Sequence, residues 1–204
     1  MTTVVGEHPV VDVSELPGYA FGHRSLLWWG TLGFIATEGT AFALAAFAYF
    51  YLRHKSSTWP PNLPPPDMLW GTVNLAILLA SCAPNQWVKR AAAREAIGPV
   101  RIGLLVMTLL GLAPLVVRWF EFPSMLCQWD TNAYCSINWA LLFLHTVHLL
   151  TDFADTAVLT ALMFTLHGRG KRFVDVSENS VYWYFVVLSW IPIWAILYLV
   201  PRLG

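Results

Sequence analysis

The sequence predicts an all-α integral membrane protein, a single bundle of five transmembrane helices with its N-terminus inside and its C-terminus outside. Apolar residues make up 57% of the 204 residues and charged residues 12%, against about 45–50% and about 25% in soluble domains. The apolar runs are continuous rather than alternating, which disfavours a β-barrel. Twelve basic residues balance twelve acidic ones, so no net positive field would attract nucleic acid. Three cysteines are too few for a disulfide-dense scaffold.

Five nearly uncharged runs are long enough to cross an apolar layer of about 30 Å. In chain order they are residues 26–52, 68–88, 102–120, 139–166 and 181–200. Glu38 interrupts the first run, and Arg118 lies near the end of the third. The links between the runs are short, so we expect residues 26–204 to form one membrane domain behind a cytoplasmic N-terminal tail, residues 1–25.

The orientation follows from the basic residues that flank the runs, because Lys and Arg accumulate on the cytoplasmic side. Eight of them fall on the N-terminal side: Arg24, Lys89, Arg90, Arg94, Arg101, Arg169, Lys171 and Arg172. The opposite side holds Arg53, Lys55, Arg118 and Arg202. We therefore predict a multi-pass protein of the inner (plasma) membrane whose N-terminus faces the cytoplasm.

Two of the three cysteines, Cys127 and Cys135, lie in the link between the third and fourth runs. The charge count places this link outside, where an oxidising compartment would favour a disulfide between them. Two free thiols are the alternative. Cys82 lies within the second run, where it is most simply a small apolar residue.

Glu38 lies near the middle of the first run, where a carboxyl group costs about 3 kcal/mol on the lenient insertion scale. It can lower that cost by carrying a proton or by accepting from a donor on a neighbouring helix. A proton relay, a cofactor ligand and a buried contact with a partner or lipid are its possible functions. A protonated residue that joins two helices is the simpler interpretation.

Four polar side chains of the fourth run share one stripe of a helix, because spacings of three and four residues return to the same face. They are His145, His148, Asp152 and Asp155. A stripe so polar cannot face lipid, so it must meet other helices, a partner subunit or water. Polar packing is the favoured interpretation; a proton path and a metal or haem site are the alternatives. No second run supplies histidines for a metal, and no catalytic motif appears elsewhere.

Five segments, in order, resemble subunit III of the haem-copper respiratory oxidases in its short five-helix form. The run Trp29–Phe42 is similar to the segment with that family's intramembrane glutamate, and Trp59-Pro60-Pro61 to its W-P-P turn. Asn74–Ser81 resembles its N-x-x-x-L-L-A-S helix, Phe143–His148 its H-x-x-H helix, and Tyr182–Val186 its Y-W-H-F-V-D helix. The chain departs from the family at Tyr184, Val187 and Asp152, where the family usually has His, Asp and Gly.

The resemblance implies a non-catalytic accessory subunit of a terminal oxidase in aerobic respiratory electron transport. Such a subunit docks beside catalytic subunit I, contacts other oxidase subunits, binds structural phospholipid, and supports proton uptake and enzyme stability. Haem and copper would then be held by the partner subunits, with no metal and no catalytic residue in this chain. Glu38, His145 and His148 match the family's intramembrane positions, while the partner's electron donor, cytochrome c or quinol, stays open, as does a nitric-oxide-reductase-like partner.

Two other classes of function remain. One is a small proton or solute translocator that uses Glu38 together with His145, His148, Asp152 and Asp155. The other is a quinone- or haem-binding membrane anchor of a dehydrogenase, which normally needs histidines on two different helices.

Overall fold

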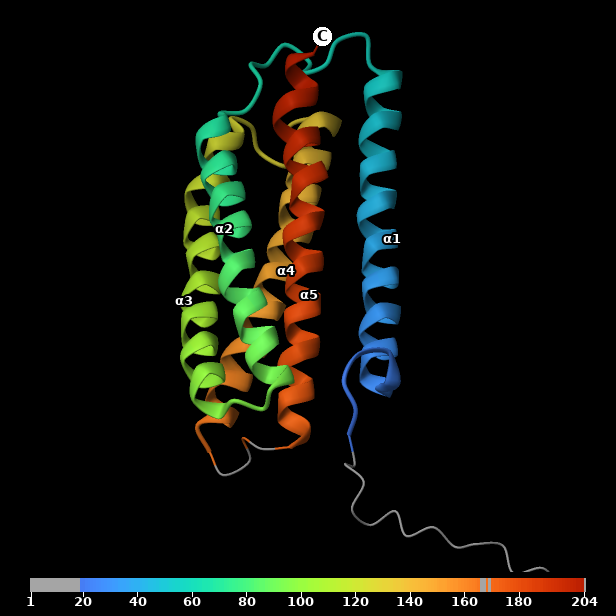
Figure 1. Cartoon of the computed structure of the whole chain (residues 1–204). Coiled ribbons are helices and arrows are strands. Elements are labelled where there is room, and N and C mark those ends of the chain that lie inside the picture. The colour runs from blue at the N-terminus through green and yellow to red at the C-terminus, as the bar shows by residue number, and fades with distance from the viewer. Residues whose placement is uncertain (1–18, 166–167, 169, 204) are drawn as a thin grey trace, which may run out of the picture.

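The computed structural model describes residues 19–165, 168 and 170–203, which form a bundle of long helices (Figure 1). Within these residues, five helices are long and apolar enough to cross a membrane, and there is no strand. The predicted all-α fold is therefore confirmed, whereas the orientation of the bundle in a membrane stays a prediction. Most of the predicted tail (residues 1–18), Leu166 and Arg169 lie outside the described residues.

Most helix ends lie beyond the apolar runs that predicted them. The helices are α1 (Leu26–Lys55), α2 (Met68–Ala93), α3 (Ile97–Glu121), α4 (Ala133–Met163) and α5 (Lys171–Trp194), and α5 continues through a π-helical segment (Ala195–Leu199) and a 3₁₀ turn (Val200–Arg202). By contrast, α4 ends at Met163, within the predicted run 139–166. The largest extension is at the start of α5, where the helix precedes the apolar run beginning at Val181. This first part of α5 carries charged side chains, so the absence of an apolar run there predicts a link rather than a helix.

Side-chain caps mark the start of three of the helices, with Ser25 accepting a hydrogen bond from the amide of Leu27 (3.2 Å) at the start of α1. Asp67 accepts a hydrogen bond from the amide of Leu69 (3.1 Å) at the start of α2, and Asn132 accepts one from the amide of Cys135 (2.9 Å) at the start of α4. Each cap satisfies an amide that the first helical turn leaves without a partner. Cys135 consequently lies in the first turn of α4 rather than in the link before it.

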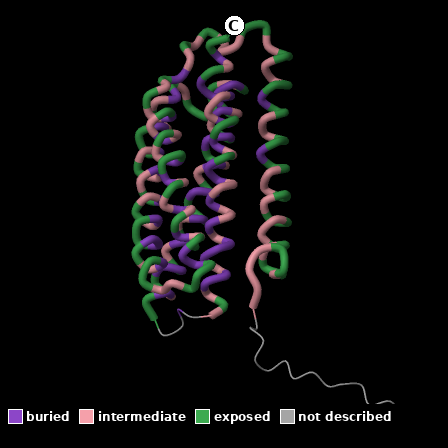
Figure 2. The backbone as a smooth tube through the Cα atoms, in the orientation of Figure 1, coloured by how far each residue is buried: buried purple, intermediate pink, exposed green. Residues whose placement is uncertain are grey.

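Helices α4 and α5 form the centre of the bundle, with α2 and α3 on one side and α1 on the other (Figure 1). Helix α1 contacts α4 and α5 and has Phe42 and Tyr49 as its buried residues. Figure 2 shows the buried positions concentrated in the other helices. The core therefore lies among α2, α3, α4 and α5, and α1 covers one face of it.

Two glycines allow close packing around α2. A Cβ at Gly71 would overlap the ring of Tyr198, and a Cβ at Gly103 of α3 would overlap a methyl group of Val88. The absence of a side chain at these positions lets the C-terminal segment and α3 approach α2, as is common in membrane helix pairs.

The chain ahead of α1 returns to the turn between α2 and α3. Tyr19 donates a hydrogen bond from its hydroxyl group to Glu95 (2.8 Å), which adopts the left-handed conformation (φ 53°). This bond to a carboxylate raises the pKa of the exposed Tyr19 phenol. It places the start of α1 and the α2–α3 turn at the same end of the bundle.

Candidate functional site: an acidic cavity and a buried polar network

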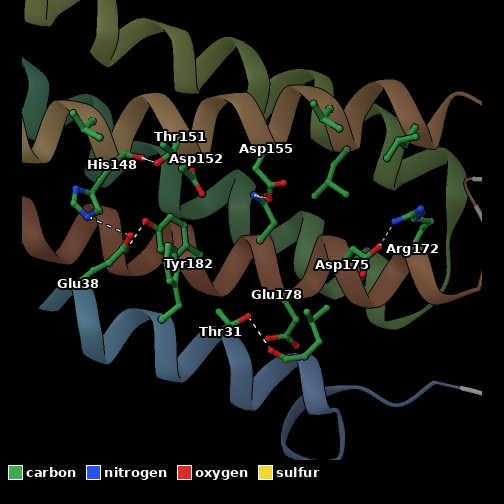
Figure 3. A pocket seen from close by; sticks show the side chains of 17 residues that line it. Thr31, Glu38, His148, Thr151, Asp152, Asp155, Arg172, Asp175, Glu178 and Tyr182 are labelled. Carbon is green, nitrogen blue, oxygen red and sulfur yellow. Dashed lines mark hydrogen bonds and ion pairs between the residues drawn. The ribbon is translucent and has the colours of Figure 1, made fainter.

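A cavity of about 640 Å³ lies between α1 on one side and α4 and α5 on the other (Figure 3). Its apolar walls include Leu27, Phe34, Val158 and Leu162. The polar side chains that line it are Thr31, Glu38, His148, Thr151, Asp152, Asp155, Arg172, Asp175, Glu178, Asn179 and Tyr182. Carboxyl groups outnumber basic groups in this set, so the cavity is acidic.

At one end of the cavity, Glu38 joins all three helices that form it. Tyr182 of α5 donates to Glu38 Oε2 (2.6 Å), and His148 Nε2 of α4 lies 3.4 Å from Glu38 Oε1. Both partners cluster on the carboxyl group in Figure 3. The intramembrane glutamate is therefore an interhelical contact, which is how its burial is compensated.

Hydrogen bonding fixes the position of one proton on His148. His148 Nδ1 lies 2.6 Å from the carbonyl oxygen of Leu144, which can only accept, so Nδ1 carries a proton. His148 therefore presents Nε2 to Glu38 Oε1, 3.4 Å away.

The carboxyl groups farther along the cavity have fewer hydrogen-bond partners than Glu38. Asp155 Oδ2 accepts from Asn179 (3.1 Å). By contrast, Asp152 is 2% exposed and Glu178 4% exposed, and none of their carboxyl oxygens has a hydrogen-bond partner among the described residues. Such buried, unpartnered polar groups are rare in folded proteins.

The other end of the cavity lies where α1 and α5 begin. Arg172 donates to Asp175 (2.8 Å), and the Arg172 side chain is 41% exposed. Leu27, in the first turn of α1, lines the cavity at the same end. The cavity thus extends from this end of the bundle to the level of Glu38.

His145 does not line the cavity, although it shares the predicted stripe with His148. Its side chain is fully buried, with Nε2 3.0 Å from the carbonyl oxygen of Val186 and Nδ1 3.0 Å from Arg118 Nη2. The carbonyl oxygen can only accept and the guanidinium can only donate, so His145 is neutral with its proton on Nε2. The two histidines of the stripe therefore have different neighbours: His145 faces α3 and α5, and His148 faces Glu38 of α1. The ring of Phe42 packs against both histidine rings.

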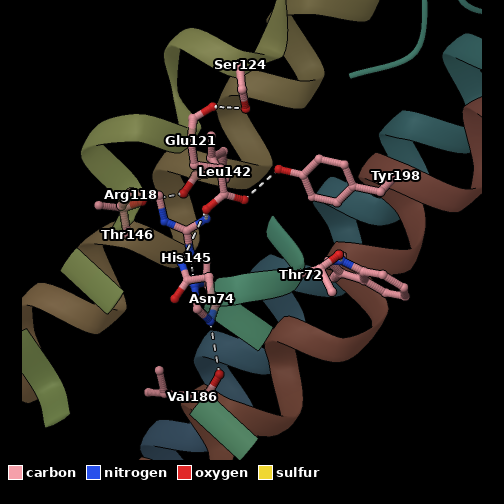
Figure 4. Close-up of polar contacts among 11 residues, drawn as sticks. Thr72, Asn74, Arg118, Glu121, Ser124, Leu142, His145, Thr146, Val186 and Tyr198 are labelled. Atoms are coloured by element: carbon pink, nitrogen blue, oxygen red, sulfur yellow. Dashed lines mark hydrogen bonds and ion pairs between the residues drawn. The ribbon is translucent and has the colours of Figure 1, made fainter. Parts of the chain in front are cut away.

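His145 belongs to a second buried network, centred on an ion pair within α3 (Figure 4). Arg118 Nη1 lies 2.6 Å from Glu121 Oε2, and both residues are at most 1% exposed. Tyr198 donates to Glu121 Oε1 (2.6 Å), Asn74 donates to Oε2 (3.2 Å), and the Arg118 guanidinium lies 4.2 Å from the centre of the Trp190 ring. The network joins α2, α3, α4 and the C-terminal segment.

This network was not predicted from the sequence. Arg118 was expected to be one of the flanking charges that set orientation, and Glu121 lies just after the third apolar run, residues 102–120. The spacing of three residues, which places the two side chains on one helix face, was the available signal. When Arg118 is left out, the number of basic residues on the predicted outer side falls from four to three, against eight on the inner side.

Cys127 and Cys135 form a disulfide in the structure, with their Cα atoms 6.0 Å apart. Trp139 Nε1 donates to the carbonyl oxygen of Cys127 (2.8 Å), which fastens the same loop to α4. The loop lies at the end of the bundle opposite the start of α1. Cys82 is unpaired in α2.

Metal ligation was one sequence-level alternative for the polar stripe. In the described part of the chain, no group of three or more His, Cys, Asp or Glu side chains is arranged to hold a metal ion. His145 uses both ring nitrogens in hydrogen bonds to the protein, and His148 uses Nδ1 in the same way.

Comparison with known proteins gives a relative of assigned function. No family model matches the chain. Over 173 residues, or 83% of each protein, the chain is 24% identical to subunit 3 of the cytochrome bo(3) ubiquinol oxidase of Pseudomonas aeruginosa.

The relative and the membrane-spanning helices together identify a multi-pass protein of the inner membrane. The ordered motifs from Trp29 to Val186 carry the same resemblance along the bundle. The match supports the resemblance of the chain to subunit III of the haem-copper respiratory oxidases.

Proposed function

We propose that this chain is a non-catalytic accessory subunit of a haem-copper terminal oxidase, docked beside the catalytic subunit in the membrane. The observation that carries the proposal is the match to an oxidase subunit 3 over 83% of both chains. The contacts of the buried histidines support it, because side chains engaged with carbonyl oxygens and Arg118 serve packing rather than haem ligation. Haem and copper would be held by the partner subunits.

The relative belongs to a ubiquinol oxidase, so a quinol oxidase is the partner to test first. A cytochrome c oxidase and a nitric-oxide-reductase-like enzyme would be distinguished by the electron donor that the purified complex accepts.

Structural phospholipid is the proposed ligand of the bundle surface. The edges of the cavity carry Phe34 and Val158, which are 55% and 57% exposed. Acyl chains would cover such apolar side chains, while the acidic interior of the cavity would stay beneath them. By holding α1 against α4 and α5, lipid would support both the stability of the subunit and the uptake of protons by the complex.

The test is purification of the tagged chain from native membranes in a mild detergent, followed by absorbance spectroscopy and native mass spectrometry. We expect a haem-copper core and bound phospholipid to accompany the chain, and the haem to stay reducible when His145 is replaced by Asn. A chain that purified alone and bound haem through His145 or His148 would contradict the proposal.

A small proton or solute translocator is a second candidate, favoured by the acidic cavity that reaches Glu38. Liposomes that contain only this chain would then show flux that Glu38→Gln abolishes. Obligate co-purification with an oxidase core, without such flux, would argue for the accessory subunit.

A further inference from the structure

The cavity contains two buried carboxyl groups, those of Asp152 and Glu178, that have no hydrogen-bond partner among the described residues. Four carboxyl oxygens are buried there without a donor. A buried polar group without a hydrogen bond costs about 1–3 kcal/mol, and a charged one more. An acyl chain supplies no donor, so lipid alone cannot satisfy them.

Water can satisfy these groups, since each molecule both donates and accepts. At about 30 Å³ per molecule, the 640 Å³ of the cavity would hold roughly 20 waters. Buried waters persist where two to four polar partners surround them, and the acids, Thr151 and Asn179 provide such partners.

The acids also follow one another along the cavity. On α4, Asp155, Asp152 and His148 are spaced by three and four residues, so neighbouring side chains lie about 5–6 Å apart at Cβ. Glu178 of α5 continues the series toward the end of the bundle where α5 begins. Gaps of this size are bridged by one or two waters, through which a proton can pass from one oxygen to the next.

The series stops at Glu38 and His148. Beyond them Phe42, 8% exposed, packs 4.7 Å from the His148 ring between ring centres. His145 offers no further step, because both of its ring nitrogens are bonded to Arg118 and Val186. The polar groups on the far side of Phe42 form a separate network around Glu121.

We propose that the cavity is a water-filled half-channel, open at the end where α1 and α5 begin and closed at the Glu38–His148 pair. Protons enter from solution as hydronium, and Asp152 holds one midway, as a carboxylic acid bonded to water. Each transfer protonates one oxygen and releases a proton from the next, so no co-reactant is consumed. The half-channel is a property of this bundle itself and does not depend on which oxidase the chain joins.

The groups that face Asp152 come from every helix around it. Glu38 lies on α1, Asp155 and His148 on α4, and Tyr182 on α5, with Lys89 of α2 close to Glu178. No cation is paired with Asp152 in the described residues. A proton is therefore the simplest means of neutralising it.

Thiol labelling of the full chain in native membranes tests the water. In a Cys82→Ser background, Thr151→Cys places a thiol in the cavity, and Thr146→Cys places one on the same helix outside it. Both threonines bond to a backbone carbonyl of α4, so the two variants are matched. We expect a charged, membrane-impermeant methanethiosulfonate to label Thr151→Cys and to leave Thr146→Cys unlabelled.

The same reagent tests which end is open. Arg94→Cys marks the end where α1 begins, and Ser57→Cys marks the opposite end. Thr151→Cys should be labelled from the side that labels Arg94→Cys and protected from the side that labels Ser57→Cys. Labelling from both sides would show a full channel, and no labelling from either side would show a lipid-filled or closed cavity; either result overturns the proposal.

Infrared spectroscopy tests the proton without a cysteine. We expect a carboxylic-acid band that shifts in D₂O and loses intensity in Asp152→Asn but not in Asp130→Asn, a change in an exposed loop. A band that fails to shift, or whose intensity is unchanged in Asp152→Asn, would contradict the proposal. A chain could fail these tests and still purify with an oxidase, so the outcome is separate from that of the proposed function.

Discussion

Glu38 shows how a single intramembrane carboxyl group can be accommodated at the residue scale. It accepts from Tyr182 and lies 3.4 Å from His148 Nε2, so it holds α1 to both α4 and α5. The buried residues of α1 are Phe42 and Tyr49, so this polar contact adds to a small buried apolar surface.

Two replacements of Glu38 test how much its hydrogen bonds contribute to the free energy of unfolding. Glu38→Gln keeps an acceptor for Tyr182 and gains a donor for His148, whereas Glu38→Ala leaves both partners without a contact. We expect Glu38→Ala to lower the free energy of unfolding by about 1–3 kcal/mol and Glu38→Gln by clearly less. Thermal unfolding in detergent measures this, and haem reduction in the co-purified oxidase should persist in both variants.

Arg118 and Glu121 form an ion pair that is buried inside the bundle, where the two opposite charges compensate each other. Breaking such a pair by removing one partner typically costs about 3–5 kcal/mol, because the remaining charge is left buried. We expect Arg118→Met to destabilise the bundle by this amount and Arg118→Met with Glu121→Gln to recover part of the loss. Equal stability of the single and double variants in chemical or thermal unfolding would show that the pair is not coupled.

At the scale of the helices, apolar runs predicted where the chain crosses the membrane, and packing decided where the helices end. The start of α5 could not be predicted from hydropathy because Arg172, Asp175 and Glu178 face the cavity rather than water alone. The start of α4 depended on the Asn132 cap, which a window of mean hydropathy does not register.

Glycines that contact a neighbouring helix should be distinguishable from those that face outward. Gly71→Ala would force a methyl group into the Tyr198 ring, and overpacking of this kind costs about 1–3 kcal/mol. Gly30→Ala is the control, since its Cβ would meet no atom within 4 Å and alanine favours the helix. We expect lower thermal stability for Gly71→Ala only; an equal loss in Gly30→Ala would contradict the prediction, because alanine favours the helix and has no close neighbour there.

At the scale of the whole molecule, the basic residues predict that α1 begins at the cytoplasmic face and that the Cys127–Cys135 loop lies outside. The disulfide of the structure lies at that predicted outer end. We expect mass spectrometry to show two alkylated cysteines more after reduction than before it, and a reporter fused after Gly204 to be active outside the cytoplasm. A cytoplasmic C-terminus would instead place the end where α1 and α5 begin, and with it the open end of the half-channel, outside the cytoplasm.

The sequence by itself determined the all-α membrane class, the resemblance to oxidase subunit III and the presence of polar residues within the apolar runs, because composition and short motifs are local properties. The sequence could not predict that His145 and His148 belong to different networks, since the two residues differ only in which helices lie opposite them. Only the tertiary structure placed His145 beside Arg118 and His148 beside Glu38. It alone also showed that Asp152 lines a cavity without a partner, because burial depends on neighbours far away in the chain.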